Sequence, residues 1–181
     1  MIEGVVNLLK PPGMTSSDAV TDIRRLFDTR RVGHAGTLDP GASGVLPICI
    51  GRATRLFDYL VDKQKEYIAE VCFGAATDTQ DSYGKVLLRA QASVSREALA
   101  AVLPRFTGEV DQTVPMFSAV RLGGRKLYEL AREGAQEVKI TRGIEVYALE
   151  LLAQTGENRF LLKMACSKGT YVRAVCADIG A

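Results

Sequence analysis

The apolar residues form short segments whose spacing changes between the strand period of two and the helix period of about 3.6, and this limits the possible folds more than any other feature. Strand-like patterns occur in residues 4–10, 45–50 and 65–73. Helical spacing occurs in residues 18–28, 52–61, 95–103 and 170–179. Because strands and helices do not alternate regularly along the chain, we predict an α+β fold with a mixed, largely antiparallel sheet flanked by helices.

Turn residues refine this prediction. Ser16 or Ser17 is a candidate N-cap for the first helix, since serine hydroxyls accept hydrogen bonds from free amides. Residues 127–132 read as a helix closed by Gly134. Three further segments read as strands: residues 116–122, 138–152 and 159–167.

The composition is that of an ordinary globular protein. Of the 181 residues, 47% are hydrophobic and 24% charged, which excludes a disordered, collagen-like or coiled-coil chain. The longest apolar runs reach about half of the roughly 20 residues that a membrane span needs. Lys10-Pro11-Pro12 interrupts the first apolar stretch, so no signal peptide is expected. We therefore expect a one-domain cytoplasmic protein without membrane association.

The charges are nearly balanced, with a net of +2 whose excess lies in residues 121–181. Basic residues gather in two clusters: Arg24, Arg25, Arg30 and Arg31, and Arg121, Arg125, Lys126 and Arg132. Such clusters suit either contact with phosphate groups or a solvated protein face, and both interpretations stay open.

The cysteines do not form a metal-binding pattern. They stand at positions 49, 72, 166 and 176, without a CxxC pair, and the chain has one histidine. Structural zinc sites usually take their ligands from closely spaced pairs such as CxxC, which this chain lacks, so we expect no metal. Buried free thiols in a reducing compartment are the simplest interpretation.

The segment from Arg31 to Gly44, RVGHAGTLDPGASG, has no useful periodicity and contains the single histidine, His34. Long irregular segments inside compact domains are often functional. The segment lacks the patterns of a Walker loop, a dinucleotide-binding loop and a hydrolase elbow. What remains is Asp39 on a glycine-rich loop. An aspartate there either caps a turn before Pro40 or acts as a nucleophile at a sugar carbon.

Residues 8–20 (LLKPPGMTSSDAV) and 33–40 (GHAGTLDP) resemble the signature of the TruB family of tRNA pseudouridine synthases. Further blocks resemble the family in the same order, across nearly the whole chain: residues 65–67, 77–84, 115–119, 124–134 and 166–173. The close match of these blocks favours the bacterial, standalone type.

This resemblance implies an isomerase that converts uridine to pseudouridine, typically uridine 55 in the T loop of tRNA. The glycosidic bond breaks, the uracil turns, and C5 joins the sugar carbon, without a cofactor or metal. The partner is the T stem and loop of tRNA, and the target base must be flipped into a pocket because it is stacked in the folded RNA. Basic side chains around that pocket would hold phosphates, and we expect a monomer.

The resemblance also implies roles for single residues. Asp39 is the catalytic nucleophile, acting either at the sugar carbon or through a glycal. Tyr67 packs on the uracil and helps to remove a proton. Arg173 pairs with the catalytic aspartate, which agrees with the ability of a nearby cation to keep a buried carboxylate ionised.

The remaining assignments concern substrate binding. His34 resembles the histidine that supports the extruded loop bases, and aromatic rings commonly stack on unpaired bases. Tyr171 resembles a residue that contacts the target nucleotide. Lys10 and Lys168 are candidates for support of the site or for contact with phosphate.

The family resemblance further implies that residues 1–181 are a catalytic domain, incomplete at its carboxyl end and without the C-terminal RNA-binding domain. Two alternatives stay open: a guide-RNA-dependent catalytic subunit of the dyskerin type, and a non-catalytic module that binds RNA or helps tRNA to fold. The joint presence of Asp39, Tyr67 and Arg173 argues against the non-catalytic module.

Overall fold

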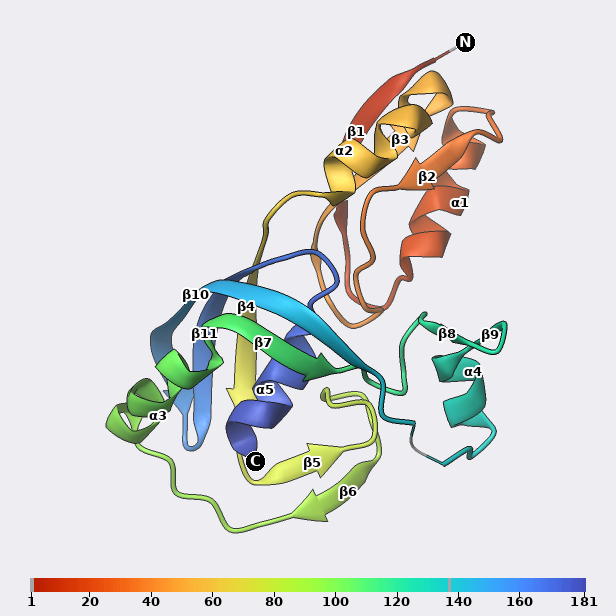
Figure 1. The fold of residues 1–181 in the computed structure, drawn as a ribbon. Coiled ribbons are helices and arrows are strands. Elements are labelled where there is room, and N and C mark those ends of the chain that lie inside the picture. The colour runs from red at the N-terminus through yellow and green to blue at the C-terminus, as the bar shows by residue number, and fades with distance from the viewer. Residues whose placement is uncertain (1, 137) are drawn as a thin grey trace. The chain divides into compact units, whose positions relative to one another are not determined.

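The structure is a computed structural model that describes residues 2–136 and 138–181. It divides into two compact units, one ending at Lys63 and the other beginning at Gln64 (Figure 1). Each unit has its own sheet and its own hydrophobic core, so the two are described separately. The assignment of all residues to one catalytic domain stays a prediction.

The first unit is built on a three-stranded antiparallel sheet in the order β1-β3-β2. Its strands are β1 (Gly4–Lys10), β2 (Val32–His34) and β3 (Gly44–Ile50). Helix α1 (Ser16–Leu26) packs one apolar face against alternate residues of these strands. The resulting core contains Ala19, Val20, Ile23, Val32, Leu46, Ile48 and Ile50.

Helix α1 begins two residues earlier than predicted, and the expectation that Ser16 or Ser17 caps it is wrong. Thr15 is the N-cap, and its Oγ1 accepts a hydrogen bond of 3.0 Å from the amide of Asp18. The Asp18 carboxylate in turn accepts from the hydroxyl and the amide of Thr15. These bonds lower the pKa of Asp18. The reciprocal capping box leaves the hydroxyl of Ser16 without a role at the helix end.

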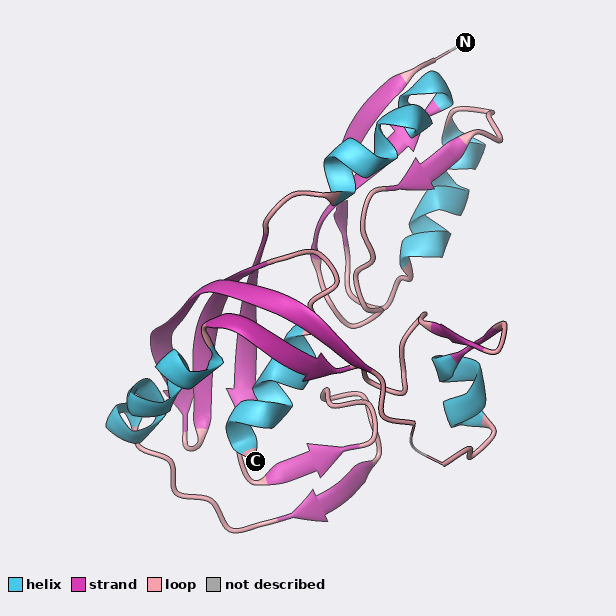
Figure 2. Ribbon diagram, viewed as in Figure 1, coloured by secondary structure: helices cyan, strands magenta, loops and turns pink. Residues whose placement is uncertain are grey.

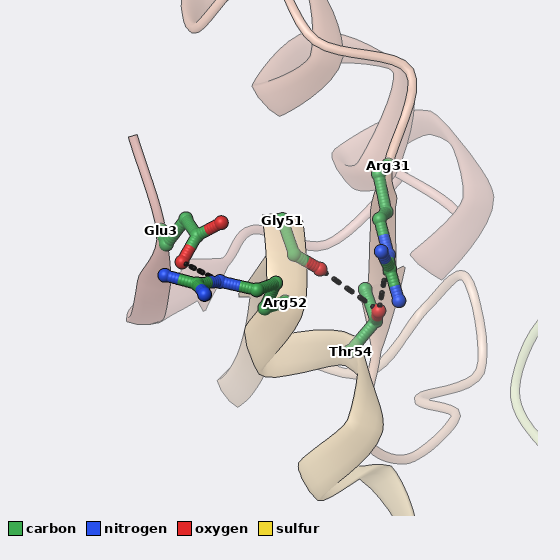
Figure 3. Close-up of polar contacts among 5 residues, drawn as sticks. All are labelled: Glu3, Arg31, Gly51, Arg52 and Thr54. Atoms are coloured by element: carbon green, nitrogen blue, oxygen red, sulfur yellow. Dashed lines mark hydrogen bonds and ion pairs between the residues drawn. The ribbon is translucent and has the colours of Figure 1, made fainter. Parts of the chain in front are cut away.

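After β3 the chain forms a 3₁₀ turn, Gly51–Leu56, and then α2 (Phe57–Val61), where a single helix over residues 52–61 was predicted. Figure 3 shows how this turn is held. Arg52 Nε donates to Glu3 at 2.6 Å, and Arg31 Nε donates to the Thr54 hydroxyl at 3.0 Å. Arg31, one member of the first basic cluster, therefore joins secondary-structure elements.

The second unit is built on a four-stranded antiparallel sheet in the order β4-β11-β10-β7. The strands are β4 (Lys65–Cys72), β7 (Gly108–Thr113), β10 (Thr141–Gly156) and β11 (Arg159–Cys166). Helices α3 (Arg96–Val102) and α5 (Val172–Gly180) pack on its apolar side chains. Phe160 belongs to one core cluster and has no exposed surface, and the centres of the Phe160 and Phe73 rings lie 5.9 Å apart in an edge-to-face arrangement.

Two short hairpins extend from this sheet (Figure 2). One pairs β5 (Ala75–Thr77) with β6 (Val86–Arg89); the other pairs β8 (Arg121–Leu122) with β9 (Arg125–Lys126) and leads into α4 (Leu127–Arg132). The predicted strand over residues 116–122 is wrong except at its end. The amide of Ser118 donates to the carbonyl of Met116 and turns the chain there.

The predicted α+β class with a largely antiparallel sheet flanked by helices is confirmed. Every strand pair between described residues is antiparallel. In the part of the chain that the structure describes, each helix is too short or too polar to cross a bilayer.

A buried glutamine fixes the start of α5. Gln112 on β7 is 2% exposed, and its amide group makes hydrogen bonds to both backbone groups of Tyr171. Gln112 Nε2 donates to the Tyr171 carbonyl at 3.0 Å, and Oε1 accepts from the Tyr171 amide at 2.8 Å. Tyr171 is the N-cap residue of α5 and makes no capping hydrogen bond with its own side chain. Gln112 therefore determines where the helix begins against the sheet.

We predict that Gln112→Met destabilises the protein by about 1–3 kcal/mol, because a side chain of similar size leaves the Tyr171 amide without its hydrogen-bond partner. The matched control is Gln154→Met on β10, where an exposed glutamine donates to the Gly156 carbonyl at 3.3 Å. Urea unfolding followed by circular dichroism measures both variants. Equal unfolding free energies for the two variants would contradict the role of Gln112.

The four cysteines are free thiols that differ in environment. Cys49 and Cys166 are buried as expected, whereas Cys72 on β4 is exposed and departs from the expectation. Burial raises the pKa of the Cys176 thiol to about 12, and it also raises the pKa of Cys49 and Cys166.

We therefore predict that iodoacetamide alkylates Cys72 first in the folded protein. Cys176 should stay unmodified between pH 7 and pH 9, because its raised pKa keeps the thiol protonated and only the thiolate reacts. Mass spectrometry of tryptic peptides gives the modified fraction at each site, and alkylation in urea provides the control for intrinsic reactivity. Rapid modification of Cys176 in the native protein would refute the burial.

Candidate active site

The loop that carries Asp39 connects β2 with β3 in the first unit. Its first residue is fixed because the amide of Ala35 donates to the Pro47 carbonyl at 2.8 Å. Its middle turns tightly, with the amide of Ala42 donating to the Asp39 carbonyl at 3.0 Å. Asp39 itself is half-buried. Between these points the loop has no strand partner and is held by other contacts.

Ser16 holds the residue before Asp39. The Ser16 hydroxyl accepts a hydrogen bond from the Leu38 amide at 3.0 Å and donates to the Leu38 carbonyl at 3.2 Å. Ser16 is 4% exposed, so these bonds are shielded from competing water. Both backbone groups of Leu38 are thereby tied to the first residue of α1.

Lys10 and Gly13 hold the residue after Asp39. The Pro40 carbonyl accepts from Lys10 Nζ at 3.3 Å and from the Gly13 amide at 2.8 Å. Lys10 Nζ also donates to the carbonyls of Pro11 and Met14, at 2.9 and 2.6 Å. The backbone is therefore fixed on both sides of Asp39, by Ser16 before it and by Lys10 and Gly13 after it.

The Lys10 side chain has no exposed surface although it carries an ionisable group. Burial lowers the pKa of Lys10, and the nearby charge of Asp39 acts in the opposite direction and raises it. Three carbonyl oxygens replace the water that the ammonium would otherwise bind. Of the two roles predicted for Lys10, these contacts favour support of the site over contact with phosphate.

His34 stands at the point where β2 enters the loop, opposite Ile48 on β3. Its ring is half-buried, and Nδ1 is shielded from solvent without a hydrogen-bond partner among the described residues.

Arg173 lies in the first turn of α5, in the second unit. Its guanidinium donates to the Thr79 carbonyl at 3.1 Å and to the Phe117 carbonyl at 2.8 Å. The guanidinium carbon lies 5.3 Å from the centre of the Tyr171 ring. Arg173 thus joins three segments that are far apart in the sequence and that each belong to a different block resembling the family.

Tyr67 and Lys168 complete the predicted residues of the second unit. Tyr67 on β4 is half-buried opposite Met164 and packs on the core formed by β10, β11 and α5. Lys168 is exposed on the turn before α5, where the Thr170 hydroxyl donates to the Ser167 carbonyl at 2.9 Å.

The structure thus places the predicted residues in two groups. Lys10, His34 and Asp39 belong to the first unit; Tyr67, Lys168, Tyr171 and Arg173 belong to the second. Among the described residues, no cluster of histidine, cysteine and acidic side chains could hold a metal ion.

Sequence reasoning missed two residues that hold these groups, Ser16 and Gln112. The sequence suggests only a capping role for Ser16, and its pattern predicts no strand where Gln112 lies. Strict alternation in β7 would have been the one available signal, since Gln112 occupies an inward position between exposed neighbours.

Comparison with known proteins extends these observations. Residues 24–172 match the family described as "TruB family pseudouridylate synthase (N terminal domain)". The chain is 49% identical over 182 residues to tRNA pseudouridine synthase B of Symbiobacterium thermophilum, which covers 99% of this chain and 61% of the relative. It is also 49% identical to the protein of that name from Pelotomaculum thermopropionicum, and the match covers 99% of this chain and 58% of that relative. The chain therefore spans about 60% of the length of these relatives.

Solved structures agree on the fold. A Cbf5-Nop10-Gar1 complex contains a chain that superposes with a TM-score of 0.74 at 30% identity, covering 98% of this chain and 43% of that one. A chain of an H/ACA RNP bound to a substrate RNA containing 2'-deoxyuridine superposes with a TM-score of 0.69 at 29% identity. The match covers 98% of this chain and 42% of that one. The family match, the identity to relatives and the fold lead to one conclusion: the chain belongs to the TruB family of pseudouridine synthases.

Proposed function

We propose that the protein isomerises uridine to pseudouridine in tRNA, at uridine 55 of the T loop, with Asp39 as the nucleophile. The N1–C1′ bond breaks, the uracil turns, and a C5–C1′ bond forms. The proton leaves C5 and N1 gains a proton, so the product is an isomer and no co-reactant is consumed. Attack at C1′ and formation of a glycal are two routes that both use the Asp39 carboxylate.

The observation that carries this proposal is the fixed backbone on both sides of Asp39. Ser16 binds Leu38, while Lys10 and Gly13 bind Pro40. A reacting group held in this way loses little freedom when the substrate arrives, which lowers the entropic part of the barrier. The buried Lys10 ammonium supplies a positive charge close to the carboxylate.

The other residues receive roles consistent with their surroundings. Tyr67 is proposed to pack on the uracil and to help remove the C5 proton. Arg173 is proposed to act with the Asp39 carboxylate as its cationic partner in the reaction. His34, Tyr171 and Lys168 are proposed to bind the flipped nucleotide and the RNA around it, in keeping with base stacking on aromatic rings.

Of the alternatives, the standalone tRNA enzyme has the stronger support. Identity to the tRNA pseudouridine synthases B reaches 49%, whereas the chain from the Cbf5-Nop10-Gar1 complex shares 30%. A non-catalytic RNA-binding module would need no rigidly held carboxylate. Tritium release distinguishes the module from the enzyme, and activity without added guide RNA distinguishes the two enzymes.

Tritium release from tRNA labelled at uridine C5 tests the proposal. We expect release by this chain, or by a chimera in which it replaces the matching part of the S. thermophilum relative. Asp39→Ala should reduce the rate by about 1,000-fold or more, because the nucleophile is lost. Binding of tRNA, measured on filters, should stay within about threefold, since phosphate contacts dominate affinity.

Asp58→Ala, which removes an exposed aspartate of α2, is the matched control and should keep full activity. Binding of tRNA without tritium release by both the chain and the chimera would exclude the enzyme and favour the RNA-binding module.

Arg173→Ala should lower kcat by about 100-fold while tRNA binding changes little, because a cation that stabilises reacting charge acts mainly in the transition state. Arg159→Ala removes a half-exposed arginine that pairs with Glu70 at 3.2 Å, and it serves as the control in the same unit. Equal losses of binding and of activity in Arg173→Ala would instead identify Arg173 as a phosphate contact.

A further inference from the structure

We propose that Ser16 is a positioning residue, which sets the place of the Asp39 carboxylate by holding the backbone of Leu38. This inference rests on the proposed role of Asp39. It concerns a side chain whose hydroxyl makes no contact with the helix end, because Thr15 and Asp18 already form the capping box of α1.

The hydroxyl is suited to this task because it donates and accepts at once. Its oxygen lies 3.0 Å from the Leu38 amide nitrogen and 3.2 Å from the Leu38 carbonyl oxygen. Together these bonds pair both the amide and the carbonyl of Leu38, as a neighbouring strand would. Among the described residues, no backbone hydrogen bond joins Leu38 to β1 or β3, so the pairing of its backbone groups rests on Ser16.

Ser16 also belongs to a rigid element. It is the first residue of α1, whose apolar face is packed in the core through Ala19, Val20 and Ile23. Leu38 packs against the same core with its side chain. The position of α1 therefore determines the position of the residue next to Asp39, through the two hydrogen bonds of the Ser16 hydroxyl and the packing of Leu38.

Loss of the hydroxyl should move the carboxylate without detaching the loop. The contacts of Lys10 and Gly13 to Pro40 remain in Ser16→Ala, so the segment after Asp39 stays held. The segment before it gains freedom. A displacement of about 1 Å of a reacting group costs up to about 100-fold in rate.

The test compares Ser16→Ala with Ser17→Ala, which removes the hydroxyl of the exposed neighbour on the same helix. In the active form of the protein, we expect Ser16→Ala to lower kcat by about 10- to 100-fold with KM for tRNA unchanged within about twofold. Ser17→Ala should match the unmutated protein. Hydrogen exchange of this chain should show faster exchange of the Leu38 amide in Ser16→Ala alone, with the core amides of β1 and β3 unaffected.

An unchanged kcat in Ser16→Ala, or a raised KM with kcat preserved, would overturn the positioning role. Faster exchange throughout the first unit would overturn it as well, because the hydroxyl would then stabilise the whole fold. Absence of tritium release by the unmutated protein overturns the proposed function instead, and that result is obtained before any variant is compared.

Discussion

Hydrogen bonds from buried polar side chains to the main chain hold both groups of predicted site residues. Ser16 and Lys10 bind the backbone beside Asp39, and Gln112 binds the backbone of Tyr171. A buried hydrogen bond contributes only about 1 kcal/mol to stability, but an unpaired buried partner costs about 1–3 kcal/mol. That asymmetry makes such contacts selective: the segment is held in one position because other positions leave polar groups unpaired.

The core and the site depend on this arrangement in different ways. Apolar packing holds α1 on its sheet in the first unit and α5 on its sheet in the second. Because the hydrophobic effect is not directional, this packing does not by itself fix the positions of single atoms. The hydrogen bonds of Ser16 then fix the position of the loop at Leu38 relative to α1. The charge of Asp39 near Lys10 adds an electrostatic preference for the same loop position. Catalysis by the proposed route needs the second level of order, because reacting groups must be placed to within fractions of an ångström.

The sequence predicts the elements with strong periodicity and local signals. Strand β1 and helix α4 have the predicted bounds, and Ser95 begins α3 as expected. Long-range effects explain the errors: β7 is defined by its partner β10, and residues 116–120 turn because of contacts that periodicity does not encode. The importance of Asp39 was visible from a motif, whereas the Ser16–Leu38 contact joins residues 22 apart and leaves no pattern in either segment.

The Lys10 ammonium ends inside a ring of main-chain oxygens from Pro11, Met14 and Pro40. Every amino acid supplies a carbonyl oxygen, so the identity of the accepting residues carries little of the interaction. The side chains of the residues that supply the accepting carbonyls can therefore change without loss of these hydrogen bonds. The donor at position 10 needs both the length and the charge of lysine. Arginine presents its donors in a planar fork instead of a compact point charge, so it is not an equivalent donor to these three oxygens. Sequence drift in this family should consequently spare position 10 more than the positions that surround it in space.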